Sequence, residues 1–326
     1  MKQKYYHAPN PLLWQGRKTK HLQEYWYQEI QCYSLFEDDL PSVDIAIIGY
    51  ASDEGVRRNQ GRVGAFAGPD AIRARLGKAA YHLKGKELID VGNIVCLDAQ
   101  LEESQNIFAA EICKLLDHHL FPIALGGGHD IAYAHLKGIE KALNKKERMK
   151  IGIINFDAHF DLRPINEQAN SGTPFYQILQ EHSERVNYMA IGIQKAANTA
   201  KLFEIADMHG VQYVFSEDCT LGQINNTLTK IETFLNTQDL IYLSIDLDGF
   251  SSAYAPGVSA PSPLGFSPHF VWKALEPILS SGKLLSCDIA EYNPKFDVDD
   301  HTANLAARLV EYIARLAQPI NIAQIV

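Results

Sequence analysis

The segment KIGIINFDAHFDLR, residues 150–163, joins an apolar run to a sudden series of polar side chains. The run up to Phe156 is typical of a strand that is buried on both faces of a parallel sheet. Asp157, His159 and Asp161 follow it at every second position. Because buried carboxylates are costly unless something neutralises them, this segment predicts a central strand that ends at a site of charge compensation.

The rest of the chain predicts the sheet to which this strand belongs. Eight apolar runs predict strands, and longer segments with helical spacing lie between them. Such alternation is typical of an α/β fold with a mostly parallel sheet that is covered on both faces. The predicted strands are 43–50, 87–92, 121–128, 150–159, 186–193, 211–215, 239–248 and 284–293; the clearest helical segments are 68–77, 106–119, 132–146, 224–237 and 267–282.

The domain organisation predicted from the sequence is simple. A length of 326 residues would allow about two domains of roughly 150 residues, but no linker separates two halves. Residues 1–40 differ from the rest, because they contain many aromatic side chains without a regular helix or strand pattern. We expect an N-terminal extension packed on the core or against a second subunit. Residues 41–326 are predicted to form a single catalytic domain.

Composition and charge exclude several classes of protein. The hydrophobic share of 46% argues against disorder, and the net charge of -9 argues against nucleic-acid or anionic-membrane partners, which need a basic surface. A small solute is the expected partner. No apolar run approaches the roughly 18 residues of a membrane helix, and a secretory signal is not evident, so we expect a soluble, cytoplasmic protein. Five cysteines without a CxxC pair predict neither a disulfide framework nor a thiolate zinc site.

Polar side chains also follow other predicted strands. In parallel α/β sheets the carboxyl ends of the strands meet in one crevice. The sequence GGGHD (126–130) adds His129 to that crevice, SIDLD (244–248) adds Asp246 and Asp248, and DIAEYNP (288–294) adds Asp288 and Glu291. Residues i and i+2 of a strand point to the same side, so Asp246 and Asp248 form a second convergent pair.

Cations between these groups are the simplest explanation of the pattern. Six ligands exceed the four that one tetrahedral zinc takes, and an oxygen-rich set suits manganese. We therefore predict two Mn ions bound by the six side chains His129, Asp157, His159, Asp161, Asp246 and Asp248.

Each motif also has a simpler interpretation. A single DxH or DxD is common in turns and helix caps. Gly126, Gly127 and Gly128 could cradle a phosphate, but the GK[ST] that completes a P-loop is missing. A single-zinc deacetylase would need fewer ligands. The two acidic pairs together with GGGHD favour the binuclear interpretation.

These motifs in order resemble those of the ureohydrolase family of arginases, agmatinases and formimidoylglutamases. The resemblance rests on GGGHD, NFDAHFD (155–161), SIDLDGFSSAYAPGVSAPSPLGF (244–266), DIAEYNP and the early loop 50–76. It implies a three-layer α/β/α sandwich with a mostly parallel eight-stranded sheet and a binuclear manganese centre. It further implies that His129 and Asp161 serve one ion, that His159 and Asp248 serve the other, and that Asp157 and Asp246 bridge both.

The same resemblance suggests the substrate. Glu291 matches the family's glutamate that receives a cationic amidine or guanidine. Ser171 stands where arginases and agmatinases carry a histidine, so a proton-shuttle histidine is missing there. This departure, with APGVSAP (255–261), SGTPF (171–175) and LWQGR (13–17), is most similar to formimidoylglutamase.

Arginines near the site fit a substrate that carries carboxylates. Arg163 follows the ligand Asp161 by two residues, and its guanidinium could bind a carboxylate through two hydrogen bonds. Arg57, Arg58 and Arg62 of the early loop are further candidates, with a solvated loop or a structural ion pair as the simpler interpretation.

The leading hypothesis is manganese-dependent hydrolysis of N-formimidoyl-L-glutamate to L-glutamate and formamide, a step of histidine degradation. Asp161 would orient the attacking water or accept its proton, and Glu291 would hold the amidinium. The alternatives are an agmatinase or another ureohydrolase of a guanidino acid, and a catalytically silent scaffold that keeps its metals. The family resemblance also implies a homo-oligomer.

Overall fold

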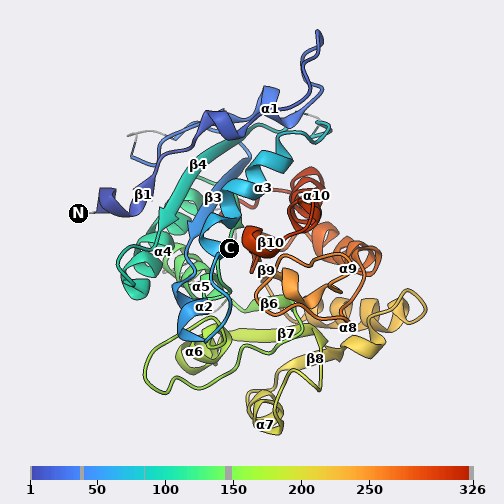
Figure 1. The fold of residues 1–326 in the computed structure, drawn as a ribbon. Coiled ribbons are helices and arrows are strands. Elements are labelled where there is room, and N and C mark those ends of the chain that lie inside the picture. Colours follow the sequence, from blue (N-terminus) through green and yellow to red (C-terminus); the bar gives the residue numbers. More distant parts are fainter. Residues whose placement is uncertain (1, 37–39, 84, 144–148, 323–326) are drawn as a thin grey trace.

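A computed structural model gives the architecture and describes residues 2–36, 40–83, 85–143 and 149–322. Figure 1 shows one central sheet with helices on both of its faces. The predicted helical segment 132–146 extends partly outside the described residues, since 144–148 are not among them.

One sheet runs through the described part of the chain, in the order β1-β4-β3-β5-β10-β9-β6-β7-β8, with β2 paired to β4. Neighbouring strands are parallel except β1, which is antiparallel to β4. Each of the eight predicted runs forms a strand, and the two-residue strands β1 and β2 are additional. The strands are β1 Tyr6–His7, β2 Gln31–Cys32, β3 Ile45–Ala51, β4 Leu88–Val95, β5 Phe121–Leu125, β6 Ile151–Phe156, β7 Val186–Ile193, β8 Gln212–Phe215, β9 Leu240–Asp246 and β10 Leu284–Ala290.

Helices cover the sheet in two layers, each with its own apolar core. Side chains of α3, α8, α9 and α10 pack against one face, and side chains of α4, α5, α6 and α7 pack against the other. The predicted three-layer α/β/α sandwich is confirmed. The helices are α1 Trp26–Glu29, α2 Glu54–Arg58, α3 Gly68–Leu76, α4 Leu101–Asp117, α5 Ile131–Ala142, α6 Pro174–His182, α7 Ala200–Met208, α8 Ile224–Asn236, α9 Pro268–Ser280 and α10 His301–Leu316.

The lengths of these helices bear on one excluded class of protein. In the ranges that the structure describes, every helix is too short or too polar to span a lipid bilayer.

Strand order brings the polar motifs together. The four strands β5, β10, β9 and β6 are consecutive neighbours in the middle of the sheet, and all run in the same direction. Their carboxyl ends therefore open into a single crevice, which is where ligands bind in open α/β sheets.

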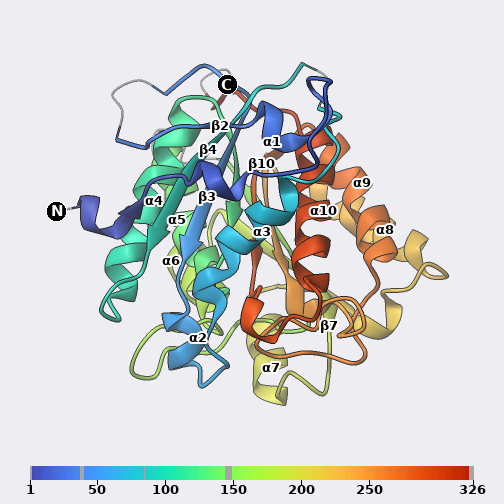
Figure 2. The same cartoon turned by 45° about the horizontal axis from the view of Figure 1, so that its top comes forward.

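The N-terminal segment lies along one edge of the sheet. Figure 2 shows it running over β4 and α3. Its strands β1 and β2 both pair with β4, and the indole of Trp14 donates a hydrogen bond to Asp90 Oδ2 at 2.9 Å. Trp26 is fully buried. The proposed division into residues 1–40 and 41–326 stays a prediction.

A buried ion pair joins α3 to β4 beneath this segment. Arg73 Nη2 lies 2.8 Å from Asp90 Oδ1, and both side chains are almost completely buried. Arg73 also donates to Asn93 Oδ1 at 2.6 Å and to the carbonyl of Gly92 at 3.0 Å. Asp70 on α3 lies 3.5 Å from Arg73 Nη1 but is half exposed, so Asp90 is the buried counter-charge and the pair joins α3 to the sheet.

Candidate metal centre

The six predicted metal ligands converge at the carboxyl ends of three strands. His129 follows β5, the series from Asp157 to Asp161 follows β6, and Asp246 ends β9 with Asp248 just beyond it. Their ligand atoms fall into two groups whose members lie within 4.8 Å of one another. The first group is His129, Asp157, Asp161 and Asp246; the second is Asp157, His159 and Asp248.

In the first group, one imidazole nitrogen lies close to three carboxylates. His129 Nδ1 lies 3.1 Å from Asp157 Oδ2, 2.8 Å from Asp161 Oδ2 and 3.0 Å from Asp246 Oδ2. A small cation at the centre of these four side chains would reach an atom of each.

The second group shares Asp157 with the first. His159 Nδ1 lies 3.5 Å from Asp157 Oδ1 and 3.3 Å from Asp248 Oδ2. Asp157 thus faces both groups, one with each carboxylate oxygen. Asp246 belongs to the first group alone by these distances, so its predicted bridging role stays a prediction.

Burial and mutual repulsion raise the pKa of two carboxylates in the cluster. Burial raises the pKa of Asp246 well above its usual range, and the charges of Asp248 and Asp157 raise it further. Burial likewise raises the pKa of Asp248 to about 6, although the imidazole of His159 opposes this shift. These two carboxylates therefore resist ionisation unless positive charge lies beside them, whereas burial of Asp157 is outweighed by the imidazoles of His129 and His159, which lower its pKa below the usual value.

The two imidazoles partly supply that charge. Burial alone would lower the pKa of His129, but the charge of Asp246 and the adjacent carboxylates of Asp157 and Asp161 raise it well above the usual value. The same balance raises the pKa of His159, through Asp248 and Asp157. In the absence of other cations, protons on the imidazoles compensate the carboxylates.

Two buried atoms test whether metal ions fit better than protons. In the described part of the chain, His129 Nδ1 and Asp248 Oδ1 form no hydrogen bond although both are buried. Buried polar atoms normally have hydrogen-bond partners. An imidazole nitrogen and a carboxylate oxygen without such partners, next to other carboxylates, are suitable ligands for a divalent ion. The donor set of two imidazoles and four carboxylates fits two such ions.

The backbone contributes to the aim of two key side chains. Asp161 has φ of 49° and Glu291 has φ of 65°, in the left-handed region that residues other than glycine seldom adopt. Each side chain therefore turns back into the crevice after its strand has ended. Strained backbone of this kind is concentrated at functional sites.

A buried hydrogen-bond chain fixes the ring of His129. Its Nε2 lies 2.9 Å from Ser244 Oγ, and the hydroxyl of Ser244 donates to Asp288 Oδ1 at 2.7 Å. Because the carboxylate only accepts, Ser244 must accept from Nε2–H, which leaves Nδ1 free to coordinate a metal. Asp288 also accepts hydrogen bonds from Tyr242 and from His135. It is fully buried and does not line the cavity.

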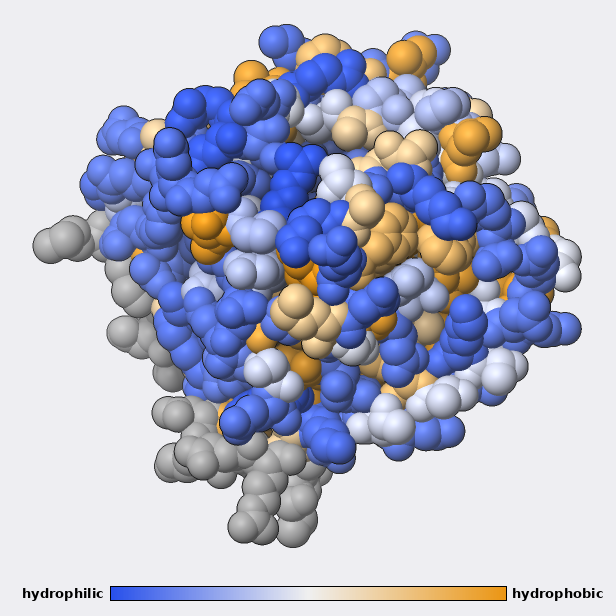
Figure 3. All heavy atoms as spheres, turned by 90° about the horizontal axis from the view of Figure 1, so that it is seen from below, coloured by the Kyte–Doolittle hydropathy of each residue, from blue (hydrophilic) through white to orange (hydrophobic). Residues whose placement is uncertain are grey.

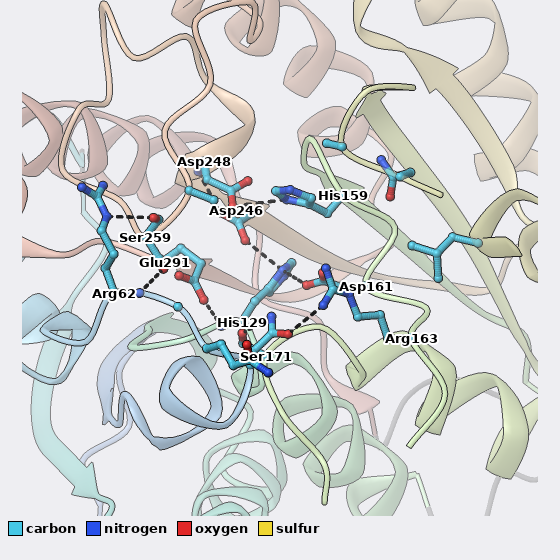
Figure 4. A pocket seen from close by; sticks show the side chains of 17 residues that line it. Arg62, His129, His159, Asp161, Arg163, Ser171, Asp246, Asp248, Ser259 and Glu291 are labelled. Atoms are coloured by element: carbon cyan, nitrogen blue, oxygen red, sulfur yellow. Dashed lines mark hydrogen bonds and ion pairs between the residues drawn. The ribbon is translucent and has the colours of Figure 1, made fainter. Parts of the chain in front are cut away.

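A cavity of about 310 Å³ lies over this cluster. Figure 4 shows its side chains, with Arg62 and Ser259 on one side of the predicted metal ligands in this view and Arg163 on the other. Glu291 and Ser171 also line it, as do Asn59, Gln60, Gly61, Ala197, Asn198, Leu202 and Ala260. The face of the molecule on which α2 and α7 lie is mostly hydrophilic, with smaller apolar groups near its middle (Figure 3).

Glu291 is the acidic group of the cavity that lies outside both ligand groups. Its Oε1 accepts a hydrogen bond from the backbone N–H of His129 at 2.8 Å, which fixes its orientation. Burial raises the pKa of Glu291 to about 8, and the charge of Asp248 adds to the effect. A cation bound next to it would restore the carboxylate form.

The structure separates the four arginines proposed for the substrate. Arg62 and Arg163 line the cavity over the metal ligands, whereas Arg57 and Arg58 line only an adjoining outer cavity of about 810 Å³. Arg57 and Arg58 both pair with Glu54, and Arg58 also pairs with Glu102. For Arg57 and Arg58 the structure therefore shows the simpler interpretation that the sequence allowed, a structural ion pair.

Several residues of the site were not predicted. Ser244 precedes Asp246 by two positions on the same strand, so the i, i+2 rule that found the ligands could also have found it. Asn59 and Asn198 line the cavity from loops, and no spacing in the sequence indicates their place.

Known proteins of the arginase family match most of this chain. A model of the arginase family matches residues 43–315. The formimidoylglutamase of Geobacillus thermodenitrificans is 41% identical over 307 residues, which cover 93% of this chain and 94% of that protein. The formimidoylglutamase of Aeromonas salmonicida is 41% identical over 309 residues, covering 93% and 97%.

Solved structures agree with this architecture. The crystal structure of Trypanosoma cruzi formiminoglutamase with Mn²⁺ superposes with a TM-score of 0.75 at 25% identity and covers 86% of this chain and 95% of that one. The formimidoylglutamase of Bacillus subtilis shares the fold, with a TM-score of 0.78 at 23% identity and coverage of 92% and 94%. With the family model matching 43–315 and relatives 41% identical over nearly its whole length, this chain belongs to the arginase family.

Proposed function

We propose that the protein hydrolyses N-formimidoyl-L-glutamate to L-glutamate and formamide, with two Mn ions held by the six-ligand cluster. The observation that carries the proposal is a cavity with a metal-type donor cluster, the carboxylate of Glu291 beside it, and two guanidinium groups at its sides. The relatives that are 41% identical carry the name formimidoylglutamase.

The two groups of side chains support the proposed ligand roles. The first ion would be held by His129 and Asp161 and the second by His159 and Asp248, with Asp157 and Asp246 as the proposed bridging ligands. Such a pair of ions, when bound, lowers the pKa of a water so that it can attack at neutral pH. Ser244 and Asp288 keep the Nε2–H tautomer of His129, so that its Nδ1 would be available to a metal ion.

Glu291 is suited to hold the cationic end of the substrate. Its carboxylate is buried and fixed by the N–H of His129. An amidinium donates two parallel N–H groups, which a carboxylate can accept as a pair. Held in this way, the formimidoyl carbon is fixed relative to the attacking water, and such positioning can contribute several kcal/mol, on the order of 7 at best.

Hydrolysis then requires two proton movements. A bond forms between the water oxygen and the formimidoyl carbon, and the bond from that carbon to the amine nitrogen of glutamate breaks. Asp161 lies in the first ligand group with its carboxylate toward the cavity, so it can accept the proton of the water. The departing amine needs a proton, which Asp161 or solvent can return because Ser171 stands at the position of the family's histidine.

Arg163 and Arg62 fit the two carboxylates of this substrate. Among the described residues neither pairs with a carboxylate: Arg163 donates to Asn59 Oδ1, and Arg62 donates to the carbonyls of Ser259 and Val258. Both guanidinium groups therefore keep an uncompensated positive charge at the cavity. That charge favours a dicarboxylate and disfavours agmatine, whose far end is a cation.

The test is a substrate panel with the manganese-loaded enzyme. Rates are compared on N-formimidoyl-L-glutamate, agmatine, 4-guanidinobutyrate and arginine, with formamide or urea as the measured product. We expect formimidoylglutamate to have the highest kcat/KM by a wide margin. A clear preference for agmatine or arginine would contradict the proposal and favour a ureohydrolase, and the absence of turnover on every compound in protein that binds manganese would favour a silent scaffold.

We also propose that the chain works as a homo-oligomer, which rests on its membership of the family. Light scattering on the purified protein would test this, and a mass equal to one chain at micromolar concentration would contradict it.

A further inference from the structure

Asn59 lies at the boundary between the cavity over the metal ligands and the outer cavity, and it lines both. It follows the last residue of α2, and its backbone N–H donates to the carbonyl of Gly55 at 3.0 Å. Its main chain is therefore fixed by the end of a helix, and its half-buried side chain projects from a rigid support.

The side chain of Asn59 connects two other residues of the cavity. Arg163 Nη1 donates to Asn59 Oδ1 at 3.1 Å, and Asn59 Nδ2 donates to Ser171 Oγ at 3.1 Å. A guanidinium can only donate, so the amide oxygen must face Arg163 and the amide nitrogen must face Ser171. The orientation of the amide thus follows from the chemistry of its neighbours.

This orientation determines what each neighbour can offer a ligand. Arg163 gives one N–H to Asn59 and keeps its other N–H groups for the cavity. Ser171 accepts from Asn59, so its own hydroxyl hydrogen stays available as a donor. Both groups then present donors, and Arg163 adds a positive charge, which is the pattern that recognises a carboxylate.

The backbone around these three residues is equally constrained. The N–H of Arg163 donates to the carbonyl of Gly172 at 2.9 Å, and the N–H of Ser171 donates to the carbonyl of Gly55 at 3.1 Å. A Cβ at Gly172 would lie 3.1 Å from Arg163 Cδ and 3.2 Å from Asn59 Nδ2. The three segments therefore pack closely around the amide of Asn59.

The neutrality of Asn59 contrasts with the two residues that precede it. Arg57 and Arg58 are compensated by the acid Glu54, and the exposed Arg57 pairs with it at 2.6 Å. Arg163 is held by an amide instead, so it is positioned without being neutralised. An acid at residue 59 would hold Arg163 in nearly the same place but would cancel its charge.

We propose that Asn59 is a positioning residue that sets the specificity of the cavity for substrates bearing a carboxylate, by orienting Arg163 and Ser171 as donors without compensating the charge of the guanidinium. This role rests on the proposed function, because it concerns the end of the substrate that lies away from the metal ions.

The test compares Asn59→Ala with Asn59→Asp in the manganese-loaded enzyme. Asn59→Ala removes both hydrogen bonds, and we expect KM for formimidoylglutamate to rise about 3- to 10-fold, with kcat changed less than about 3-fold. Asn59→Asp keeps a partner for Arg163 but neutralises it and makes Ser171 donate away from the cavity. We expect a larger rise in KM, of roughly 30-fold or more.

Two further variants separate positioning from a general effect of charge or of folding. Asn225→Asp introduces the same charge at an exposed position of α8 that lines neither cavity, and its KM should stay within about 3-fold of the wild type, since surface charges are largely screened. In an Arg163→Ala background, Asn59→Asp should change KM by less than about 3-fold, because most of its effect depends on the guanidinium. Manganese affinity should be the same in all variants.

The outcomes distinguish this inference from the proposed function. Wild-type enzyme that releases no formamide from formimidoylglutamate overturns the proposed function and this role together. Active wild-type enzyme with Asn59→Asp equal to or better than Asn59→Ala overturns the positioning role alone, because a residue that only holds the local structure would be replaced best by the isosteric acid.

Discussion

Ser244→Ala removes the hydroxyl that fixes the ring of His129. That hydroxyl lies 2.9 Å from His129 Nε2 and donates to Asp288 Oδ1 at 2.7 Å, and all three side chains are buried. In the variant Nε2–H loses its partner in a place that water does not readily reach. The ring can then rotate or take the other tautomer, and its Nδ1 becomes a weaker ligand.

The expected magnitude follows from these contacts. Loss of an outer partner of a metal-binding histidine typically weakens metal affinity about 10- to 100-fold. That corresponds to about 1.4 to 2.7 kcal/mol of binding free energy. The range agrees with a penalty of about 1 to 3 kcal/mol for a buried donor that is left without an acceptor. The full effect should appear in the affinity for the ion that His129 binds, whichever of the two measured Mn affinities that is.

The assay is calorimetric titration of Mn²⁺ into metal-free protein. Ser286→Ala is the matched control: Ser286 is equally buried on the neighbouring strand β10, but in the described part of the chain its hydroxyl has no hydrogen-bond partner. We expect Ser286→Ala to bind Mn²⁺ like the wild type. Ser244→Ala that folds normally and binds both ions within about 3-fold of the wild type would refute the reasoning.

Two further predictions concern the stability of the metal-free protein in urea. Glu54 accepts hydrogen bonds from Arg57 and Arg58, chiefly from Arg57, and these lower its pKa below the usual 4.5. The stabilisation is present above pH 4.5 and is lost as the pH falls through the lowered pKa; because Arg57 is exposed and its charge is screened, Glu54→Gln should cost only about 1 kcal/mol at pH 7 and progressively less below pH 4.5. An equal cost at pH 7 and at low pH would show that the ion pairs do not matter. Asp90→Asn leaves the buried Arg73 without its buried counter-charge, with only the half-exposed Asp70 at 3.5 Å, and should lower the free energy of unfolding by about 3 kcal/mol; a loss below about 1 kcal/mol would contradict the account of this pair.

The fold was predictable because most of its long strands are buried on both faces. Such strands are mainly apolar runs that the local sequence is enough to find, whereas β8 at the edge of the sheet is short and partly exposed. The strands β1 and β2 have two residues each and no pattern of their own, and their pairing with β4 depends on contacts far along the chain.

The candidate site was predictable where a local rule applied. The i, i+2 rule of a strand found the pairs at Asp157 and Asp246, and the parallel sheet brought them together. The turned-back conformations of Asp161 and Glu291 depend on positive φ angles that residue type does not indicate.

The early loop shows both a missed local signal and a limit. Glu54 precedes Arg57 and Arg58 by three and four residues, which is the spacing of ion pairs on a helix, so their pairing could have been predicted. The contacts of Asn59 with Arg163 and Ser171 join residues more than a hundred positions apart, and a single sequence does not reveal them.

The most direct test of the binuclear centre is the number of Mn ions bound per chain at saturation, measured by elemental analysis after removal of free metal. The wild type is predicted to retain two ions, and Asp157→Ala, which removes the carboxylate shared by both ligand groups, is predicted to lose both ions or to bind them far more weakly. A wild type that saturates with one ion or none, or an Asp157→Ala variant that keeps two with unchanged affinity, would contradict it.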